Sequence, residues 1–445
     1  MRDDADVTDS GTEDDRPAEN PAASTARGGR SAPGGARRPR RRRWLRWAAL
    51  STSLFVLGAA GVGWTLYEKL DRNIRTDVGT AKELRRYAAE RPEPPSGEAK
   101  NILLIGSDSR GGSNGAYGHD EGSQRSDTAI LLHISADRSS ATGVSLPRDL
   151  MVELPACGRS DGNRSEVQFA QFNWAFQLGG AACTIRTVEK LTGIRVDHHL
   201  VVDFAGFKSL VDTVGGVEVC LPGAVRDRAS KLDLPAGRQT LGGEDALSYV
   251  RARHGLGNGS DTDRMSRQQQ FLGSLVKKVR SNGVLLNPAK LYPVVHSATS
   301  ALTADAGLDS LGELYELVRG TRDIPEERVR FLTVPRQSYT RDSNRDELVQ
   351  PAADQLFAQL REDRPVRVES GSEEGQQAAP VPSVRPEDAP RNQAPGSAVR
   401  SSMRKTPEQQ TPLHDDQPGK PPPVYRGTTA AHDICTTDDA EIGVN

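Results

Sequence analysis

Two aspartates and an arginine of this sequence stand where apolar runs begin or end. Asp108 and Arg110 follow the run Asn101–Gly106, and Asp127 precedes the run Thr128–Ile134. Ligands of open α/β sheets bind at the ends of strands. Asp108 and Asp127 are therefore candidates to share one Mg2+, which takes one or two carboxylates together with phosphate oxygens and water. The alternative is that both are turn or capping residues, as aspartates often are.

Arginines gather in three further segments that follow apolar runs. They are Arg148 in Pro147–Asp149, Arg251 and Arg253 in Tyr249–His254, and Arg264, with Gln268, in Asp261–Gln270. Each arginine alone is more often a solvated surface residue. Two guanidinium groups about 6 Å apart repel by roughly 3 kcal/mol at an effective dielectric of 20. A cluster therefore requires an anion, and the planar donor fork of arginine suits phosphate oxygens, which favours a diphosphate ligand.

The last of these segments also predicts an amphiphilic helix. At 100° per residue, Arg264, Gln268, Phe271 and Leu275 fall within about 60° of one face. The face begins polar and ends apolar, as binding a charged head and a hydrocarbon tail would require, and the helix start favours an anion. The alternative is that Phe271 and Leu275 are ordinary core residues.

The elements that would position these residues are buried strands alternating with helices. Further strands are expected at Thr142–Leu146, His199–Val202, Val217–Cys220 and Val329–Val334. Helices are expected at Phe169–Leu191, Ala205–Val214, Glu244–Arg251, Met265–Val279, Pro288–Ser300 and Leu311–Val318. This alternation predicts one α/β layered domain over residues 100–368, a size that buries a core comfortably.

The chain outside that domain differs from it in composition. Only 35% of the 445 residues are hydrophobic, and glycine and proline concentrate at the two ends. Residues 1–46 and 369–445 are therefore expected to be disordered. Residues 68–99 are expected to form an extracytoplasmic stalk, with a helix at Thr80–Ala89 that the prolines after Arg91 end. The net charge of −2 argues against nucleic-acid binding by bulk charge.

Residues 47–67 predict a transmembrane helix. The segment is uncharged, has about the 20 residues that a span needs, and carries Trp47, Trp64 and Tyr67 at its ends as interfacial anchors. A cleaved signal peptide or a buried core helix is the alternative. The arginines of residues 37–46 favour a cytoplasmic N-terminus. The protein is thus expected in the cell membrane with a single pass and an extracytoplasmic catalytic domain.

That topology favours disulfides over metal sites for the four cysteines. Cys157 and Cys183 are the preferred pair, and a disulfide between them would close a loop of about 27 residues and contribute about 3 kcal/mol. Cys220 and Cys435 are left without an assignment.

Taken together, these segments resemble the LytR-CpsA-Psr family of cell-wall glycopolymer ligases over roughly Lys100 to Val334. The motifs that carry the resemblance are LLIGSDSR (103–110), RSDT (125–128), SLPRD (145–149), FNWAFQLGG (172–180), VDFAGFKSLVDTVGGVEV (202–219), LGGEDALSYVRARH (241–254) and DTDRMSRQQQF (261–271). Cys157, Cys183 and the arginine-rich N-terminal segment resemble those of actinobacterial proteins.

The resemblance implies an αβα sandwich with a central mixed sheet and an apolar lipid-binding tunnel. It also implies transfer of a glycopolymer phosphate from a polyprenyl diphosphate carrier to a peptidoglycan hydroxyl, with Mg2+. By resemblance, Asp108 and Asp127 lie on the metal side, and Asp261 opens the last motif. The residues expected to bind the diphosphate head are Arg110, Arg148, Arg251, Arg253, Arg264 and Gln268. Arg148, Arg251 and Asp261 are the expected catalytic residues, and Asp261 or Asp149 is a candidate base.

Three other functions stay open from the sequence. A regulatory membrane protein would bind lipid-linked precursors without chemistry, and a hydrolase would release lipid phosphate to water. DNA binding through residues 37–46 is disfavoured, because basic residues beside a span are explained by topology and anionic lipid.

Overall fold

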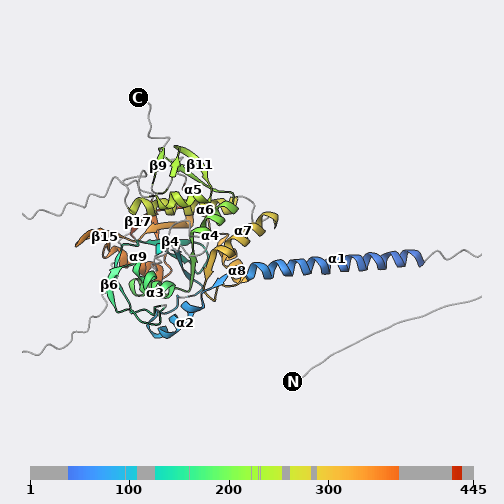
Figure 1. Cartoon of the computed structure of the whole chain (residues 1–445), viewed down its shortest axis with the longest axis horizontal. Coiled ribbons are helices and arrows are strands. Elements are labelled where there is room, and N and C mark those ends of the chain that lie inside the picture. Colours follow the sequence, from blue (N-terminus) through green and yellow to red (C-terminus); the bar gives the residue numbers. More distant parts are fainter. Residues whose placement is uncertain are drawn as a thin grey trace, which may run out of the picture. The chain divides into compact units, whose positions relative to one another are not determined.

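The computed structural model describes residues 39–95, 97–107, 126–159, 161–221, 223–228, 230, 232–252, 261–281, 288–369 and 423–432. The chain divides into a unit that ends at Gly63 and a second unit that begins at Trp64. The first unit contributes most of α1 (Pro39–Asp71), and the second holds the other helices and strands that are described. Figure 1 shows the second unit, called the domain below, as helices packed around a central sheet.

The helix α1 contains the expected span. Its segment Trp44–Asp71 is long and apolar enough to cross a membrane. Bulky apolar side chains along it, such as Leu54 at 73% and Phe55 at 76%, are exposed. A helical segment whose bulky apolar side chains are exposed in this way is suited to a lipid environment. The candidate span Trp44–Asp71 contains the predicted segment 47–67.

The central sheet is mixed, and nine strands of the described part of the chain belong to it. In spatial order they are β1 (Arg75–Thr76), β12 (Leu302–Ala304), β7 (His198–Val202), β2 (Lys100–Ser107), β3 (Ser126–Ile134), β4 (Ala141–Leu146), β13 (Val329–Thr333), β17 (Val424–Thr429) and β16 (Arg367–Glu369). The pairs β2–β7 and β4–β13 are parallel, whereas β2–β3 and β3–β4 are antiparallel. All of the predicted central strands are present, with ends that differ from prediction by one or two residues.

The two faces of the sheet pack against different helices. Because side chains alternate along a strand, Leu103 and Leu131 face one core and Ile102 faces the other. The first core is completed by α3 (Trp174–Thr192) and α9 (Ala352–Arg361). The second core is completed by α6 (Asp261–Ser281) and α8 (Leu311–Thr321). These layers confirm the expected αβα architecture.

Three more helices pack beside α6 rather than on the sheet. They are α4 (Phe204–Thr213), α5 (Gly243–Arg251) and α7 (Pro288–Ala301). With α6 they enclose a separate apolar cluster that includes Val211, Tyr249 and Phe271. Two small ribbons extend this part of the domain, β8 (Val217–Leu221) with β11 (Gly237–Leu241) and β9 (Val225–Asp227) with β10 (Leu232–Leu234).

Two further hairpins lie near the end of β4. They are β5 (Met151–Leu154) with β6 (Gln168–Gln171), and β14 (Arg336–Tyr339) with β15 (Asp342–Leu348). The prediction of a helix from Phe169 is wrong at its start, because Phe169 pairs with Glu153 in the β5–β6 ribbon. The helix α3 begins only at Trp174.

The disulfide Cys157–Cys183 is confirmed, and it joins the segment after β5 to α3 with a Cα–Cα distance of 5.6 Å. Cys220 in β8 is disulfide-bonded as well. Cys435 lies outside the described residues.

The expectation of a disordered C-terminal segment is wrong for β17. This strand inserts between β13, to which it is antiparallel, and β16, to which it is parallel. Gly427 permits the close approach, since a Cβ there would lie 2.3 Å from the backbone oxygen of Phe331. The last described residues of the chain therefore form an interior strand of the sheet.

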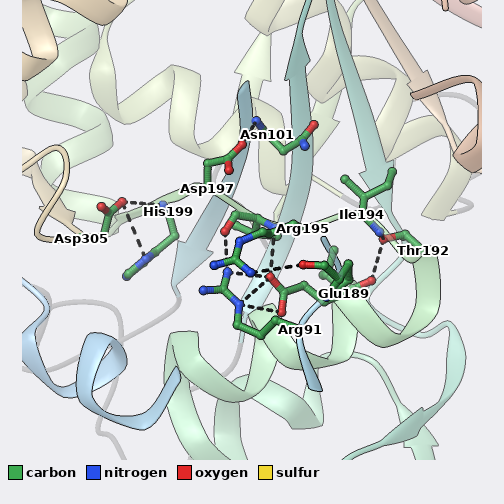
Figure 2. A network of polar contacts seen from close by, with 12 residues as sticks. Arg91, Asn101, Glu189, Thr192, Ile194, Arg195, Asp197, His199 and Asp305 are labelled. Atoms are coloured by element: carbon green, nitrogen blue, oxygen red, sulfur yellow. Dashed lines mark hydrogen bonds and ion pairs between the residues drawn. The ribbon is translucent and has the colours of Figure 1, made fainter. Parts of the chain in front are cut away.

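The segment expected to be a separate stalk packs on the domain. Its helix α2 (Val78–Arg86) is capped by Asp77, whose carboxylate accepts from the backbone N–H of Thr80. Arg91 donates through Nη2 to Glu189 Oε1 at 2.6 Å, and Val196 N donates to the same carboxylate at 3.0 Å. Figure 2 shows this network between the segment, α3 and the start of β7. The chain that follows α1 is thus tied to the domain by buried polar contacts.

Candidate functional site

The antiparallel pairing of β3 with β4 brings two predicted site residues together. Asp127 lies at the start of β3 and Arg148 follows the end of β4, and the register pairs Ala129 with Leu146. Arg148 Nη1 donates to Asp127 Oδ1 at 3.2 Å, and the two side chains are 16% and 33% exposed. A cation and a carboxylate therefore face each other at this edge of the sheet.

Asp149 forms the second partner of Arg148. Arg148 Nε donates to Asp149 Oδ2 at 3.1 Å, and Gln171 Nε2 donates to Asp149 Oδ1 at 2.6 Å. The guanidinium of Arg345, on β15, lies 3.7 Å from the same carboxylate. Three donors from β6, β15 and the end of β4 thus converge on Asp149 and fix the orientation of Arg148.

Gln268 joins the first turns of α6 to this edge. Its Oε1 accepts from the hydroxyl of Thr128, the neighbour of Asp127, at 3.4 Å. Its Nε2 donates to the backbone oxygen of Val250 at 3.1 Å. One side chain therefore bridges the start of β3 and the end of α5, where Arg251 is the next residue.

Arg251 lies beside the end of β7. Its guanidinium carbon is 4.3 Å from the centroid of the Phe204 ring, a cation–π contact. Phe204 begins α4 directly after β7, and β7 pairs with β2 so that Val202 lies beside Gly106. The carboxyl ends of β2 and β7 thus meet the C-terminus of α5, as a ligand site at the end of an α/β sheet requires.

Two further arginines of α6 are buried near this edge. Arg264 is 5% exposed and Arg267 is 7% exposed. Arg267 donates to the backbone oxygen of Ala252, just after Arg251. Burial lowers the pKa of Arg267 below its usual value, although Tyr249, Asp263 and Asp227 oppose that shift. Arg267 is not among the predicted site residues, although its spacing of three residues from Arg264 places both on one side of the helix.

Several predicted residues are not placed. Asp108, Arg110 and Arg253 lie outside the described residues, and so does the side chain of Asp261, although α6 begins at that residue. The predicted pair of metal-side aspartates is therefore represented by Asp127. Asp127 is a partly exposed carboxylate, and carboxylate oxygens are ligands that Mg2+ accepts in proteins. In the part of the chain that the structure describes, no cluster of three or more metal-ligating side chains occurs.

Apolar side chains continue from the polar edge along the sheet. Leu272 and Val276 of α6 pack against the same core as Leu104 and Leu132 of the sheet, and all four are only partly buried. Phe271, by contrast, turns toward α4, where its ring centroid lies 5.6 Å from that of Phe207.

The predicted amphiphilic face is therefore shifted by one residue. Gln268 marks its polar end, and Leu272 and Val276 are its sheet-facing apolar residues. Phe271 and Leu275 belong to the neighbouring cluster, as the alternative of ordinary core predicted.

Comparison with known proteins identifies relatives of this chain. The family model LytR_cpsA_psr matches residues 67–362. The cell wall biosynthesis protein LcpA of Corynebacterium glutamicum is 36% identical over 311 residues, which are 64% of this chain and 58% of LcpA. A polyisoprenyl-teichoic acid–peptidoglycan teichoic acid transferase, TagU of Bacillus cereus, is 28% identical over 63% of this chain and 86% of TagU.

A solved structure shows the same fold. Protein gbs0355 of Streptococcus agalactiae superimposes with a TM-score of 0.50 at 21% identity, over 60% of this chain and 88% of that chain. The match to LcpA, in contrast, spans less than two thirds of the length of that relative.

Proposed function

The chain belongs to the LytR-CpsA-Psr family, and on that premise we propose that it transfers a glycopolymer phosphate from a polyprenyl diphosphate carrier to a peptidoglycan hydroxyl. The observation that carries this proposal is the path along α6 from a cationic edge to partly buried apolar side chains. Arg148, Gln268 and Arg251 line the edge, and partly buried Leu272 and Val276 follow on the same helix.

This path matches the two parts of a lipid-linked donor. The diphosphate would lie against Arg148 and Arg251, with Arg253 and Arg264 as further donors to its oxygens. The prenyl chain would pass between the sheet and α6, beside Leu104 and Leu132, in the tunnel that members of the family are expected to have. Partly buried apolar side chains in that layer support this placement, because a closely packed core would bury them fully.

The reaction exchanges one phosphorus–oxygen bond for another. The acceptor hydroxyl attacks the phosphorus nearest the sugar, the bridging bond of the diphosphate breaks, and polyprenyl phosphate leaves with the bond's electron pair. Negative charge grows on the bridging oxygen in this step, and fixed guanidinium donors stabilise it. The proton of the hydroxyl would pass to a carboxylate, for which Asp149 and Asp261 are the candidates.

Mg2+ would be held by Asp127 together with Asp108 and would neutralise phosphate charge. Asp127 also orients Arg148 through its hydrogen bond. The contribution of this chain is therefore to hold one guanidinium between two carboxylates, Asp127 and Asp149, so that it faces the phosphates without a change of rotamer.

The topology follows from the same proposal. With its arginine-rich segment in the cytoplasm, α1 would place the domain outside the cell membrane, where peptidoglycan lies. The disulfide Cys157–Cys183 supports this side, since disulfides persist in oxidising compartments.

The test uses the full chain in detergent with a synthetic polyprenyl diphosphate glycan, soluble peptidoglycan fragments and Mg2+. Mass spectrometry should detect a phosphodiester between glycan and peptidoglycan. Arg148→Ala should lower the rate by about 10²–10³, the cost of one preorganised donor to a developing oxyanion. Arg226→Ala is the matched control, because Arg226 forms a surface ion pair and is 82% exposed.

Other outcomes of the same assay would identify the two alternative functions. Release of the glycan phosphate to water alone would identify a hydrolase. Stable donor binding without any product would identify a regulatory protein.

A further inference from the structure

An aromatic pair lies on the two hairpins that supply Gln171 and Arg345 to Asp149, the partner of Arg148. Phe169 on β6 and Tyr339 on β14 have ring centroids 6.1 Å apart, with planes at 53°. Phe169 is 57% exposed and Tyr339 is half-buried. Figure 1 shows β6 and β15, the partner strand of β14, at the same end of the domain. The two rings, called the aromatic platform below, offer an apolar surface that the domain's own core does not use.

The strand β6 connects the platform to the proposed phosphate site. Gln171 stands two residues after Phe169, so both side chains leave β6 on the same face, about 7 Å apart. Gln171 donates to Asp149 at 2.6 Å, and Asp149 accepts from Arg148 at 3.1 Å. A ligand on the platform would therefore end beside the guanidinium proposed to hold the diphosphate.

The β5–β6 ribbon and the helix α6, which lie on either side of this site, pack on opposite faces of the sheet. The buried residues of β5 and β6, such as Val152 and Ala170, join the core that contains Leu103. Leu272 of α6 packs in the other core, with Ile102. Arg148, at the end of β4, stands between the two layers.

Phosphoryl transfer needs this separation. The attacking and leaving oxygens lie roughly in line, on opposite sides of phosphorus. If the prenyl phosphate leaves on the side of α6, the acceptor hydroxyl must arrive from the side of β6 and β14. The aromatic platform is the surface over which it would approach.

We propose that the aromatic platform binds a sugar ring of the peptidoglycan glycan strand and directs its hydroxyl toward Arg148; this rests on the proposed function. A sugar ring presents an apolar C–H face and a rim of hydroxyls. Aromatic rings cover the face, and tyrosine adds a polar end. Gln171 and Arg345 at Asp149, and Gln337 on β14, supply donors and acceptors for the rim. Two rings are too small a surface for a stable protein interface, which buries about 1,200 Å2 or more.

The first experiment measures transfer by the full chain at saturating donor and varied soluble glycan oligomers. Phe169→Ala/Tyr339→Ala should raise the KM for the acceptor about tenfold, the equivalent of about 1.4 kcal/mol, and leave the KM for the donor unchanged. Phe169→Trp should restore most of the acceptor affinity. Tyr315→Ala is the matched control, because Tyr315 is a 60% exposed aromatic on α8, and Figure 1 shows α8 on the other side of the domain from β6 and β15. An unchanged acceptor KM in the double variant would overturn the proposal.

The second experiment separates this proposal from the proposed function. Binding of the full chain to insoluble peptidoglycan is measured by co-sedimentation without donor. Weaker binding by the double variant supports the platform even if the wild type transfers nothing, in which case the proposed function alone fails. Equal binding by the double variant and the wild type overturns the platform. Loss of binding to lipid vesicles, with peptidoglycan binding intact, would also overturn it and assign the rings to a membrane surface.

Discussion

The buried ion pair between Arg91 and Glu189 gives the sharpest stability prediction. Glu189 is 4% exposed and Arg91 is 13% exposed. The carboxylate accepts from Nε and Nη2 of Arg91 and from the backbone N–H of Val196. Glu189→Leu would leave the Val196 amide without this acceptor and the Arg91 guanidinium without a counter-charge, although Arg91 Nη2 still donates to the backbone oxygen of Val196. Breaking a buried pair in this way costs about 3–5 kcal/mol.

The same helix carries a control with the same geometry and different burial. Lys190 Nζ lies 2.6 Å from Glu153 Oε1, the distance found between Arg91 and Glu189, but these side chains are 47% and 55% exposed. Exposed pairs contribute about 0–1 kcal/mol. Lys190→Met should therefore change the free energy of unfolding by less than about 1 kcal/mol.

Thermal and urea unfolding of the full chain in detergent, followed by circular dichroism, measures both effects. At about 2–4 °C per kcal/mol for a large domain, Glu189→Leu should lower Tm by about 6–20 °C. Arg91→Met/Glu189→Leu should recover most of the loss and keep about 1–3 kcal/mol for the unsatisfied amide of Val196. A double variant as unstable as the sum of its two single variants would refute the argument, because the cost would then not come from an uncompensated charge.

Three more outcomes follow. Burial raises the pKa of Asp77, but hydrogen bonds from His199 and Thr80 outweigh burial and hold that pKa at about 2. Because this pKa is below the value in the unfolded chain, about 2 kcal/mol of stability should be present above pH 4 and lost as the pH falls toward 2. Asp77→Asn should remove that part of the acid dependence, measured in urea titrations between pH 2 and 7. Gly427→Ala should cost about 1–3 kcal/mol by overpacking against β13, measured as a lower Tm, whereas Gly223→Ala should be neutral because a Cβ there meets nothing within 4 Å. Arg148→Lys should keep the charge but lose the planar fork, and transfer assays should place its rate between those of the wild type and Arg148→Ala.

The sequence predicted the strands that are buried on both faces. The run Asn101–Gly106 is continuous and apolar because β2 lies between β7 and β3 under helices on both sides. The helix was wrongly predicted to begin at Phe169, because a strand of four residues is too short for its hydrophobic period to be distinguished from that of a helix. The pairing of Phe169 with Glu153 in β5 decides the outcome, and that contact is not encoded locally.

The site was predictable where strand ends determine it. Arg148 and Asp127 meet because β3 and β4 are antiparallel neighbours, which their order in the chain suggested. The roles of Gln171 and Arg345 at Asp149 were not predictable. Both residues arrive on hairpins whose placement depends on long-range packing.

The position of β17 has a consequence for how the protein is made. The strand is one of the last described parts to be synthesised, yet it lies between β13 and β16. Until it emerges, the nascent chain presents the edge of β13 with its hydrogen-bonding groups unpaired, and such an edge recruits other strands. Folding of this half of the domain must therefore wait until β17 has been synthesised, and a chain that terminates before β17 would carry an open edge that proteases and chaperones can recognise.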